Sequence, residues 1–334
     1  MPNEPRQILA LETSPFCRSL AVVPALRSLK TAYPNAYVVA AACRGACEII
    51  VAASLADETL DLGMIDPVSQ NLGPAVKRLI RMLRLTRRRS FDLAVDFSSA
   101  LETQISLRFG LTSRVISRAR APHLVELLIG AAKGGRRIED HRSDCEQVLR
   151  QLGLDLGEQR SAFTLPVEEN QRFELLLARH GSKGGEPIVI FYGSGATIGR
   201  GSPAVWLNEV AVRLVNNFGA RIIAVDDPYS RAFTSSIAGT LPRGSILLAS
   251  PRALEVAASI ARASLVVSDE GELSNLTSSF QTPLLEIRNA GGRSVPSRAD
   301  RVVFGSAGRR LADDVFEAAC EMIQASRLPS LFQR

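Results

Sequence analysis

A loop near the start of the chain carries the first residue types that could do chemistry. It lies between an apolar run, ILAL (8–11), and an amphipathic stretch that begins near position 18, and its tip reads Pro-Phe-Cys-Arg (15–18). In many α/β enzymes the tip of such a loop holds a catalytic group. Arg18 cannot take up a proton because a guanidinium stays protonated in proteins. Cys17 would be basic only as a thiolate, which is an unusual base for a hydroxyl. The loop therefore binds an anion through Arg18 or packs without reacting.

Two carboxylates are better candidates for accepting a proton. Glu12 stands at the first loop, and Asp96 ends the apolar strand predicted in FDLAVDFSS (91–99). The carboxyl ends of parallel strands are where open α/β sheets bind ligands. The alternative for both residues is a purely structural polar role.

The richest loop of the second half is FYGSGATIGRGSP (191–203). Backbone N–H groups of a glycine-rich turn can cradle a phosphate, and a helix N-terminus behind it adds positive potential. The dinucleotide fingerprint fails because the third glycine of the pattern is displaced to Gly199. A turn without function is the alternative. The predicted phosphate-binding residues are Gly193, Ser194, Gly195, Ala196, Thr197 and Arg200.

A second loop of this half is VVSDEGELSNLTSSF (266–280). Asp269 ends a predicted strand and is placed to accept hydrogen bonds from ribose hydroxyls. Asp269 and Ser274 are also suitable helix N-caps. The residues around this loop therefore predict either a nucleotide contact or a local cap.

The chain offers little for metal or disulfide chemistry. Its three histidines, His123, His141 and His180, form no recognisable metal spacing. The five cysteines are scattered, and the CxxxC of Cys43 and Cys47 is not a standard zinc or redox motif. We expect no metal site and free thiols in a reducing cytoplasm.

The elements that position these loops alternate between strand and helix in both halves of the chain. This pattern predicts α/β domains with parallel sheets. A polar stretch (155–171) separates the halves and is the expected linker. The sequence therefore predicts two Rossmann-like domains facing a central cleft, one over 1–160 and the other over 161–334. We expect neither a membrane helix nor a signal peptide.

The 334 residues carry a formal net charge of +6, and the excess is concentrated in clusters. The stretch 77–90 has seven basic residues and no acid, and 114–123 and 133–137 are further basic clusters. In 77–90 leucines interleave with the bases, which suits a helix packed on a core with a solvated face. The other interpretation is that Arg81, Arg84, Arg87 and Arg88 face an anionic membrane or lipopolysaccharide surface. An aromatic content of 5% argues against nucleic acid as a partner.

In this order of elements the chain resembles glycosyltransferase family 9, the ADP-heptose:lipopolysaccharide heptosyltransferases. The resemblance spans nearly the whole chain. It implies the GT-B fold, with the acceptor in the N-terminal domain and the nucleotide sugar in the C-terminal domain, and metal-independent transfer without a cofactor. The strongest segments are ILALETSPFCRSLAVVPALRSLKTAYPNA, FDLAVDFSSALETQISLRFG, DHRSDCEQVLRQLGLD, IVIFYGSGAT and ASIARASLVVSDEGELSNLTSSFQTP.

The functional motifs of that family are degenerate here. Cys17 and Arg18 stand where the family has Gly-Asp, whose Asp is the expected base. In the donor loop Asp269, Glu270 and Gly271 are followed by one extra residue, and Asn275 stands where a His is expected. The family's Lys-Arg-Trp-Pro is replaced by Arg-Gly-Ser-Pro (200–203), and its acid after the next strand has no clear match in 227–231.

The resemblance leaves two functions open. The first is inverting transfer of a heptose-type sugar from an ADP-sugar or other nucleotide sugar to a lipopolysaccharide or other glycan acceptor. The alternative is an inactive relative, a pseudoenzyme that binds such precursors as a scaffold. An oxidoreductase is disfavoured by the missing fingerprint. Either protein is expected in the cytoplasm, with peripheral contact at the inner face of the cytoplasmic membrane.

Overall fold

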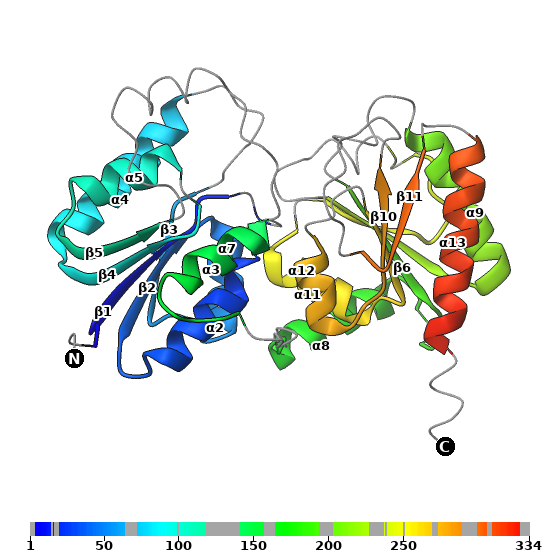
Figure 1. The fold of residues 1–334 in the computed structure, drawn as a ribbon. Helices are drawn as coiled ribbons and strands as arrows, with labels where there is room; N and C mark the ends of the chain where they lie inside the picture. The colour runs from blue at the N-terminus through cyan, green and yellow to red at the C-terminus, as the bar shows by residue number, and fades with distance from the viewer. Residues whose placement is uncertain are drawn as a thin grey trace. The chain divides into compact units, whose positions relative to one another are not determined.

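The computed structural model divides the chain into two compact units, Met1–Ser161 and Ala162–Arg334 (Figure 1). Each unit is built around its own parallel sheet. The structure describes residues 4–14, 16, 20–63, 72–98, 100–117, 141–156, 164–182, 184–193, 203–226, 237, 239–249, 251–268, 273–288, 299–305 and 309–327.

Unit 1 contains a five-stranded sheet in the order β3-β2-β1-β4-β5. Its central strands are short apolar runs such as QILAL and YVVAAA, which is typical of parallel strands buried on both faces. The strands are β1 (Gln7–Leu11), β2 (Tyr37–Ala42), β3 (Glu58–Asp61), β4 (Phe91–Asp96) and β5 (Thr112–Ser117). The helices are α2 (Val22–Ala32), α3 (Arg44–Ala52), α4 (Leu72–Arg88), α5 (Leu101–Arg108) and α7 (His141–Arg150).

Helices cover both faces of this sheet. Helices α4 and α5 lie beside each other on one face, and α2 and α3 lie on the other (Figure 1). The core under α4 and α5 includes Leu9, Leu11 and Met82, which are 0% exposed. Successive side chains of a strand point to opposite faces of the sheet, so alternate residues of one strand contact different helices.

Unit 2 contains a six-stranded sheet in the order β11-β10-β9-β6-β7-β8. The strands are β6 (Ile188–Gly193), β7 (Arg221–Asp226), β8 (Ile246–Leu248), β9 (Leu265–Ser268), β10 (Leu284–Arg288) and β11 (Arg301–Phe304). The helices are α8 (Val167–Arg179), α9 (Pro203–Phe218), α11 (Ala253–Arg262), α12 (Ser274–Phe280) and α13 (Arg309–Arg327).

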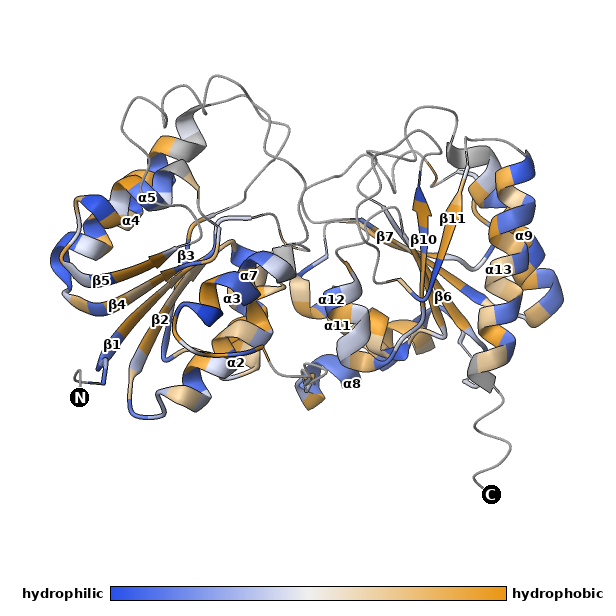
Figure 2. Ribbon diagram, in the orientation of Figure 1, coloured by the Kyte–Doolittle hydropathy of each residue, from blue (hydrophilic) through white to orange (hydrophobic). Residues whose placement is uncertain are grey.

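The larger core of unit 2 lies under α9 and α13, which share one face of the sheet (Figure 1). Trp206 and Leu214 of α9 and Val315 of α13 are buried there. Helices α11 and α12 cover the opposite face. Orange residues concentrate on the strands of both units in Figure 2, in agreement with these buried cores.

Most predicted elements are present, with several different boundaries. The amphipathic sequence over 141–155 predicts one helix, but α7 ends at Arg150, and Gly153 follows with a φ of +71°, a conformation that favours glycine. Strand β11 was not predicted, and its four residues are too few for a clear periodicity. The end of the predicted linker is helical, because α8 begins at Val167. The sequence also predicts a helix over 229–239, and most of these residues lie outside the described part of the chain.

Within the described part of the chain, no helix combines the length and the apolarity required to cross a bilayer. The four cysteines described there, Cys43, Cys47, Cys145 and Cys320, are free thiols.

Candidate functional site

The strand order of unit 2 places β6 and β9 side by side at the point where the direction in which strands are added to the sheet reverses. From β6 the chain continues outward through β7 and β8, and from β9 through β10 and β11. The loops leaving the carboxyl ends of two such strands diverge and open a crevice, where open α/β sheets bind ligands. Gly193 ends β6 and Ser268 ends β9, so both predicted donor loops start at this edge.

Buried polar residues accompany these two strand ends. Gly193 is the register partner of Asp226 on β7, and Ser268 is the partner of Glu286 on β10. Asp226, Ser268 and Glu286 are 1%, 0% and 3% exposed. Buried polar side chains therefore gather at the carboxyl edge of this sheet, which is the edge where open α/β sheets bind ligands.

Glu286 holds an arginine that the sequence motifs did not indicate. Nε of Arg288 lies 2.7 Å from Oε1 of Glu286, and Nη2 lies 3.2 Å from Oε2. The pair shares one face of β10 because its members are two residues apart. A charged residue on each side of Ile287 is unusual for a buried strand, so the sequence LLEIR could have indicated this ion pair. Arg288 is therefore a fixed cation at the end of β10.

Asn275 lies in the first turn of α12, and its main-chain carbonyl accepts a hydrogen bond from Oγ of Ser279 at 3.1 Å. The prediction that Ser274 caps this helix is wrong. The N-cap is Leu273, which makes no side-chain bond, and Ser274 is already helical. Leu273 already has helical dihedral angles, with φ −61° and ψ −19°, so the helical conformation includes the residue before Ser274.

Several predicted site residues lie outside the described part of the chain and remain predictions. They are Cys17 and Arg18 in the first loop, Ser194, Gly195, Ala196, Thr197 and Arg200 in the glycine-rich loop, and Asp269, Glu270 and Gly271 in the donor loop.

The sheet of unit 1 has its own reversal point between β1 and β4, and both candidate bases lie there. Leu11 is the register partner of Asp96, and the N–H of Phe97 donates to the carbonyl of Leu11 at 3.0 Å. Glu12 follows Leu11 directly. The fold thus places both carboxylates at the carboxyl edge of unit 1.

Asp96 is 0% exposed and surrounded by hydroxyl groups. Oγ of Ser98 lies 3.0 Å from Oδ1, whereas Oγ1 of Thr103 and Oγ of Ser117 lie 2.9 Å and 3.4 Å from Oδ2. The hydroxyl of Thr103 is also 2.7 Å from the carbonyl of Ala100 and can donate to only one of the two acceptors. These contacts stabilise an ionised carboxylate but leave it no exposed surface.

Glu12 is also enclosed, with 2% of its surface exposed. One carboxylate oxygen accepts the N–H of Ser14 at 2.6 Å, and the N–H of Glu12 donates to the carbonyl of Ala41 at 2.9 Å. Glu12 therefore fixes the turn that leaves β1. A general base must contact the proton it removes, so side chains around either carboxylate would have to move before a substrate could reach it.

No group of three or more histidine, cysteine, aspartate or glutamate side chains suited to a metal ion occurs among the residues that the structure describes.

Comparisons by sequence find no relative: no family model matches the chain, and no curated protein matches it. Solved structures do match. A glycosyltransferase family 9 protein from Veillonella parvula has a TM-score of 0.72 at 13% identity, covering 96% of this chain and 97% of that one. The ADP-heptose lps heptosyltransferase II of E. coli has a TM-score of 0.62 at 15% identity, covering 97% and 99%.

A third structure with this fold, the UDP-GlcNAc 2-epimerase of Methanocaldococcus jannaschii in complex with UDP-GlcNAc and UDP, has a TM-score of 0.54 at 11% identity, covering 95% of this chain and 92% of that one. Two Rossmann-like domains matched over nearly their whole length define the GT-B fold, which confirms the fold expected from the sequence. Within this class the chain is structurally similar to family 9 glycosyltransferases.

Proposed function

We propose that this protein is a family 9-like glycosyltransferase that takes a heptose-type sugar from a nucleotide sugar and transfers it to a lipopolysaccharide-type acceptor. The observation that supports this most is the match to a family 9 structure over 96% of the chain, which extends to both sheets. Unit 2 binds the donor and unit 1 the acceptor in this proposal.

The donor diphosphate is proposed to bind at the carboxyl ends of β6 and β9. The N–H groups of the turn 193–197 would surround the phosphate oxygens, with Arg200 as the nearby cation and Asp269 accepting hydrogen bonds from the ribose. Glu270, Gly271 and Asn275 would complete the sugar side of the site. No cofactor or metal takes part in this scheme.

Nucleotide affinity tests the site directly. Calorimetry with ADP-heptose should show binding that Gly195→Trp abolishes by filling the turn and that Asp269→Ala weakens about tenfold through loss of charged hydrogen bonds. Asp314→Ala, an exposed position on α13, is the control and should bind normally. If both site variants bind ADP-heptose as tightly as the unaltered protein, the assignment of the nucleotide site is wrong. If UDP-sugars bind more tightly than ADP-heptose, the donor nucleotide is UDP and not ADP.

In the transfer itself, an acceptor oxygen bonds to the anomeric carbon as the bond to the nucleoside diphosphate breaks, and a base removes the hydroxyl proton. Glu12 and Asp96 are the proposed bases, since Arg18 occupies the position where the family has its Asp. A base contributes about 10²–10⁴-fold to the rate. We therefore expect Glu12→Gln or Asp96→Asn to reduce turnover by such a factor, with unchanged donor affinity, if that residue is the base.

A catalytically inactive relative is the second candidate, favoured by a specific observation. Both carboxylates are enclosed and hold main-chain or hydroxyl groups, while Arg18 and Asn275 replace the family's Asp and His. Such a protein would bind ADP-heptose without transferring it. Turnover on the order of 1 per second or more with a lipopolysaccharide-core acceptor would exclude this candidate, whereas binding without turnover would support it.

A lipopolysaccharide-type acceptor would bring the protein to the inner face of the cytoplasmic membrane. Peripheral contact with anionic lipid is therefore part of the proposal, and nucleic acid is not an expected partner.

A further inference from the structure

One side of helix α4 is basic and exposed from Lys77 to the end of the helix at Arg88. The exposed bases on this side are Lys77, Arg81, Arg84, Arg87 and Arg88, which recur at about one helical turn, while Met82 on the opposite side is 0% exposed. The helix contains no acidic residue. Figure 2 shows hydrophilic and hydrophobic residues interleaved along it. The sequence interpretation of a core-packed helix is thus correct for one side, and the other side presents a row of cations.

The turn between α5 and β5 is fixed against the end of this helix. The N–H of Leu111 donates to the carbonyl of Thr86 at 2.7 Å, and the carbonyl of Leu111 accepts the N–H of Phe91 at 3.0 Å. A Cβ on Gly110 would lie 2.5 Å from Cβ of Thr86, so only glycine allows this close approach. The residues on either side of Gly110 are therefore held next to the last turn of α4.

Those two residues are large, apolar and exposed. Phe109 is 53% exposed and Leu111 is 60% exposed. Exposed side chains of this size are ordinary when scattered, but a pair beside a cluster of cations is a combination that membrane surfaces bind. We call the cluster the basic tip, and it consists of Arg84, Arg87, Arg88, Arg108, Phe109 and Leu111.

The acidic residues around the basic tip do not neutralise it. Glu58 pairs with Arg89, and Glu102 pairs with Arg78. The carboxylate of Asp92 accepts the N–H groups at positions 6 and 7, at 2.7 and 2.9 Å. Among the described residues, the four arginines of the basic tip have no ion-pair partner.

Neither the helix dipole nor a nucleic-acid partner accounts for the whole basic tip. Cations in the last turn of a helix interact favourably with its dipole, which accounts for Arg87 and Arg88 but not for two exposed apolar side chains next to them. A single-stranded nucleic acid would need several aromatic rings for stacking, and the tip has one.

We propose that the basic tip docks unit 1 on an anionic phospholipid bilayer, which gives a surface to the membrane contact included in the proposed function, with the arginines at the headgroups and Phe109 and Leu111 inserted at the acyl boundary. The tip lies at the amino-terminal edge of the sheet, where β4 and β5 begin, while Glu12 and Asp96 lie at the carboxyl edge. Docking there leaves the candidate site of unit 1 uncovered.

Vesicle co-sedimentation of the full chain tests the electrostatic part of the proposal. Binding should require phosphatidylglycerol in phosphatidylcholine vesicles and should fall as salt rises, because the attraction acts within a Debye length. Arg84→Glu/Arg87→Glu/Arg88→Glu should bind at least about 100-fold more weakly, since three cationic contacts become repulsive. The proposal would be overturned if the protein bound vesicles of pure phosphatidylcholine with an affinity that did not change with salt concentration.

A matched control separates local charge from net charge. Arg179→Glu/Arg243→Glu/Arg310→Glu changes the net charge equally at exposed positions of unit 2 and should bind like the unaltered protein. Equal loss in both triple variants would overturn the assignment of the surface. So would a short RNA that removes the protein from vesicles at low excess, because it would make nucleic acid the preferred partner.

Insertion of the apolar pair is measured separately with lipids brominated on their acyl chains, which quench only tryptophans within the bilayer. The chain has one tryptophan, Trp206, which is buried in unit 2 and should not be quenched. Phe109→Trp should add quenchable emission, whereas Val167→Trp, at a position 65% exposed in unit 2, should not. Binding without quenching of Phe109→Trp would overturn the insertion.

Discussion

Three hydroxyl groups surround the carboxylate of Asp96, and each comes from a different part of unit 1: Ser98 after β4, Thr103 on α5 and Ser117 at the end of β5. Asp96 is 0% exposed, so these hydroxyl groups are hydrogen-bond partners for a buried carboxylate that would otherwise be costly to bury. Asp96 therefore links α5 and β5 to the central strands, whether or not it also takes part in catalysis.

A double-mutant cycle measures this link. Asp96→Ala and Thr103→Val should each lower the free energy of unfolding by about 1–3 kcal/mol, and the double variant should lose less than the sum. Urea unfolding is the measurement, with Ser113→Ala, exposed on β5, as the control. Additive losses would show that the two side chains do not stabilise each other. A variant Asp96→Asn that loses activity but not stability would instead assign the residue to catalysis.

Burial raises the pKa of the Cys47 thiol to about 12, and the neighbouring Cys43 thiol adds to the effect. At neutral pH Cys47 is therefore protonated and unreactive. We expect iodoacetamide to alkylate it at least about 100-fold more slowly in the native protein than in urea, measured by mass spectrometry of the peptide. Comparable rates in both states would contradict the buried, protonated thiol.

The same pKa shift gives a pH dependence of stability. The native state holds the proton more tightly than the unfolded state, whose thiol titrates near pH 9.0. The stabilisation is complete below that pH and is lost as the pH rises towards 12. Cys47→Ala should reduce the fall in stability over this range.

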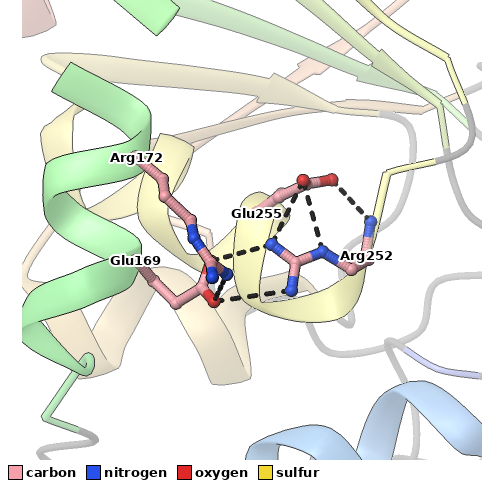
Figure 3. A network of polar contacts seen from close by, with 4 residues as sticks. All are labelled: Glu169, Arg172, Arg252 and Glu255. Carbon is pink, nitrogen blue, oxygen red and sulfur yellow. Dashed lines mark hydrogen bonds and ion pairs between the residues drawn. The ribbon is translucent and has the colours of Figure 1, made fainter. Parts of the chain in front are cut away.

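At the scale of elements, a polar network ties the start of α11 to α8 (Figure 3). Glu169 is 7% exposed and accepts hydrogen bonds from Arg172 at 2.6 Å and from Arg252 at 3.0 Å. Glu255 accepts the N–H of Arg252 at 2.9 Å, which satisfies an amide before the helix begins. Burial alone would lower the pKa of Arg252, but its bonds to Glu169 and Glu255 raise it.

Removing the carboxylate at the centre of this network should loosen the contact between α8 and α11. Glu169→Gln should lower the free energy of unfolding by about 1 kcal/mol, because the lost charged hydrogen bonds are offset by a smaller desolvation cost. Glu168→Gln, the exposed neighbour in the same helical turn, should change it by less than about 0.5 kcal/mol in the same urea titration. Equal effects would show that the network does not stabilise the contact.

At the scale of the whole molecule, each unit has its own sheet and its own buried core, which predicts separable unfolding. The single tryptophan, Trp206, reports on unit 2 alone, whereas far-ultraviolet circular dichroism reports on both units. We expect the two signals to have different midpoints in urea.

Core variants in the two units identify the transitions. Met82→Ala in unit 1 should lower the stability of that unit by about 2–5 kcal/mol and leave the fluorescence midpoint unchanged. Leu214→Ala should lower the stability of unit 2 by a similar amount and shift the fluorescence midpoint to a lower urea concentration. Coincident shifts of both signals in either variant would show that the two units unfold as one.

The sequence by itself determined the class of fold, because buried parallel strands are written as apolar runs such as ILAL, IVIF and LVVS, and each is followed by a helix period. It also placed Glu12, Asp96 and Gly193 at strand ends, since that placement depends only on local order. The segments that carry most of the predicted donor site, 194–200 and 269–272, stay predictions.

Only the tertiary structure decided how distant residues combine. The hydroxyls around Asp96 come from positions 98, 103 and 117, and no local pattern indicates that they converge. Glu286 becomes the partner of Ser268 through strand register, which is set by packing across the sheet. The basic side of α4 follows from the helical spacing of its lysine and arginines. The position of Phe109 and Leu111 beside it depends on the close contact of Gly110 with Thr86. Such contacts join segments far apart in sequence, where local periodicity carries no information.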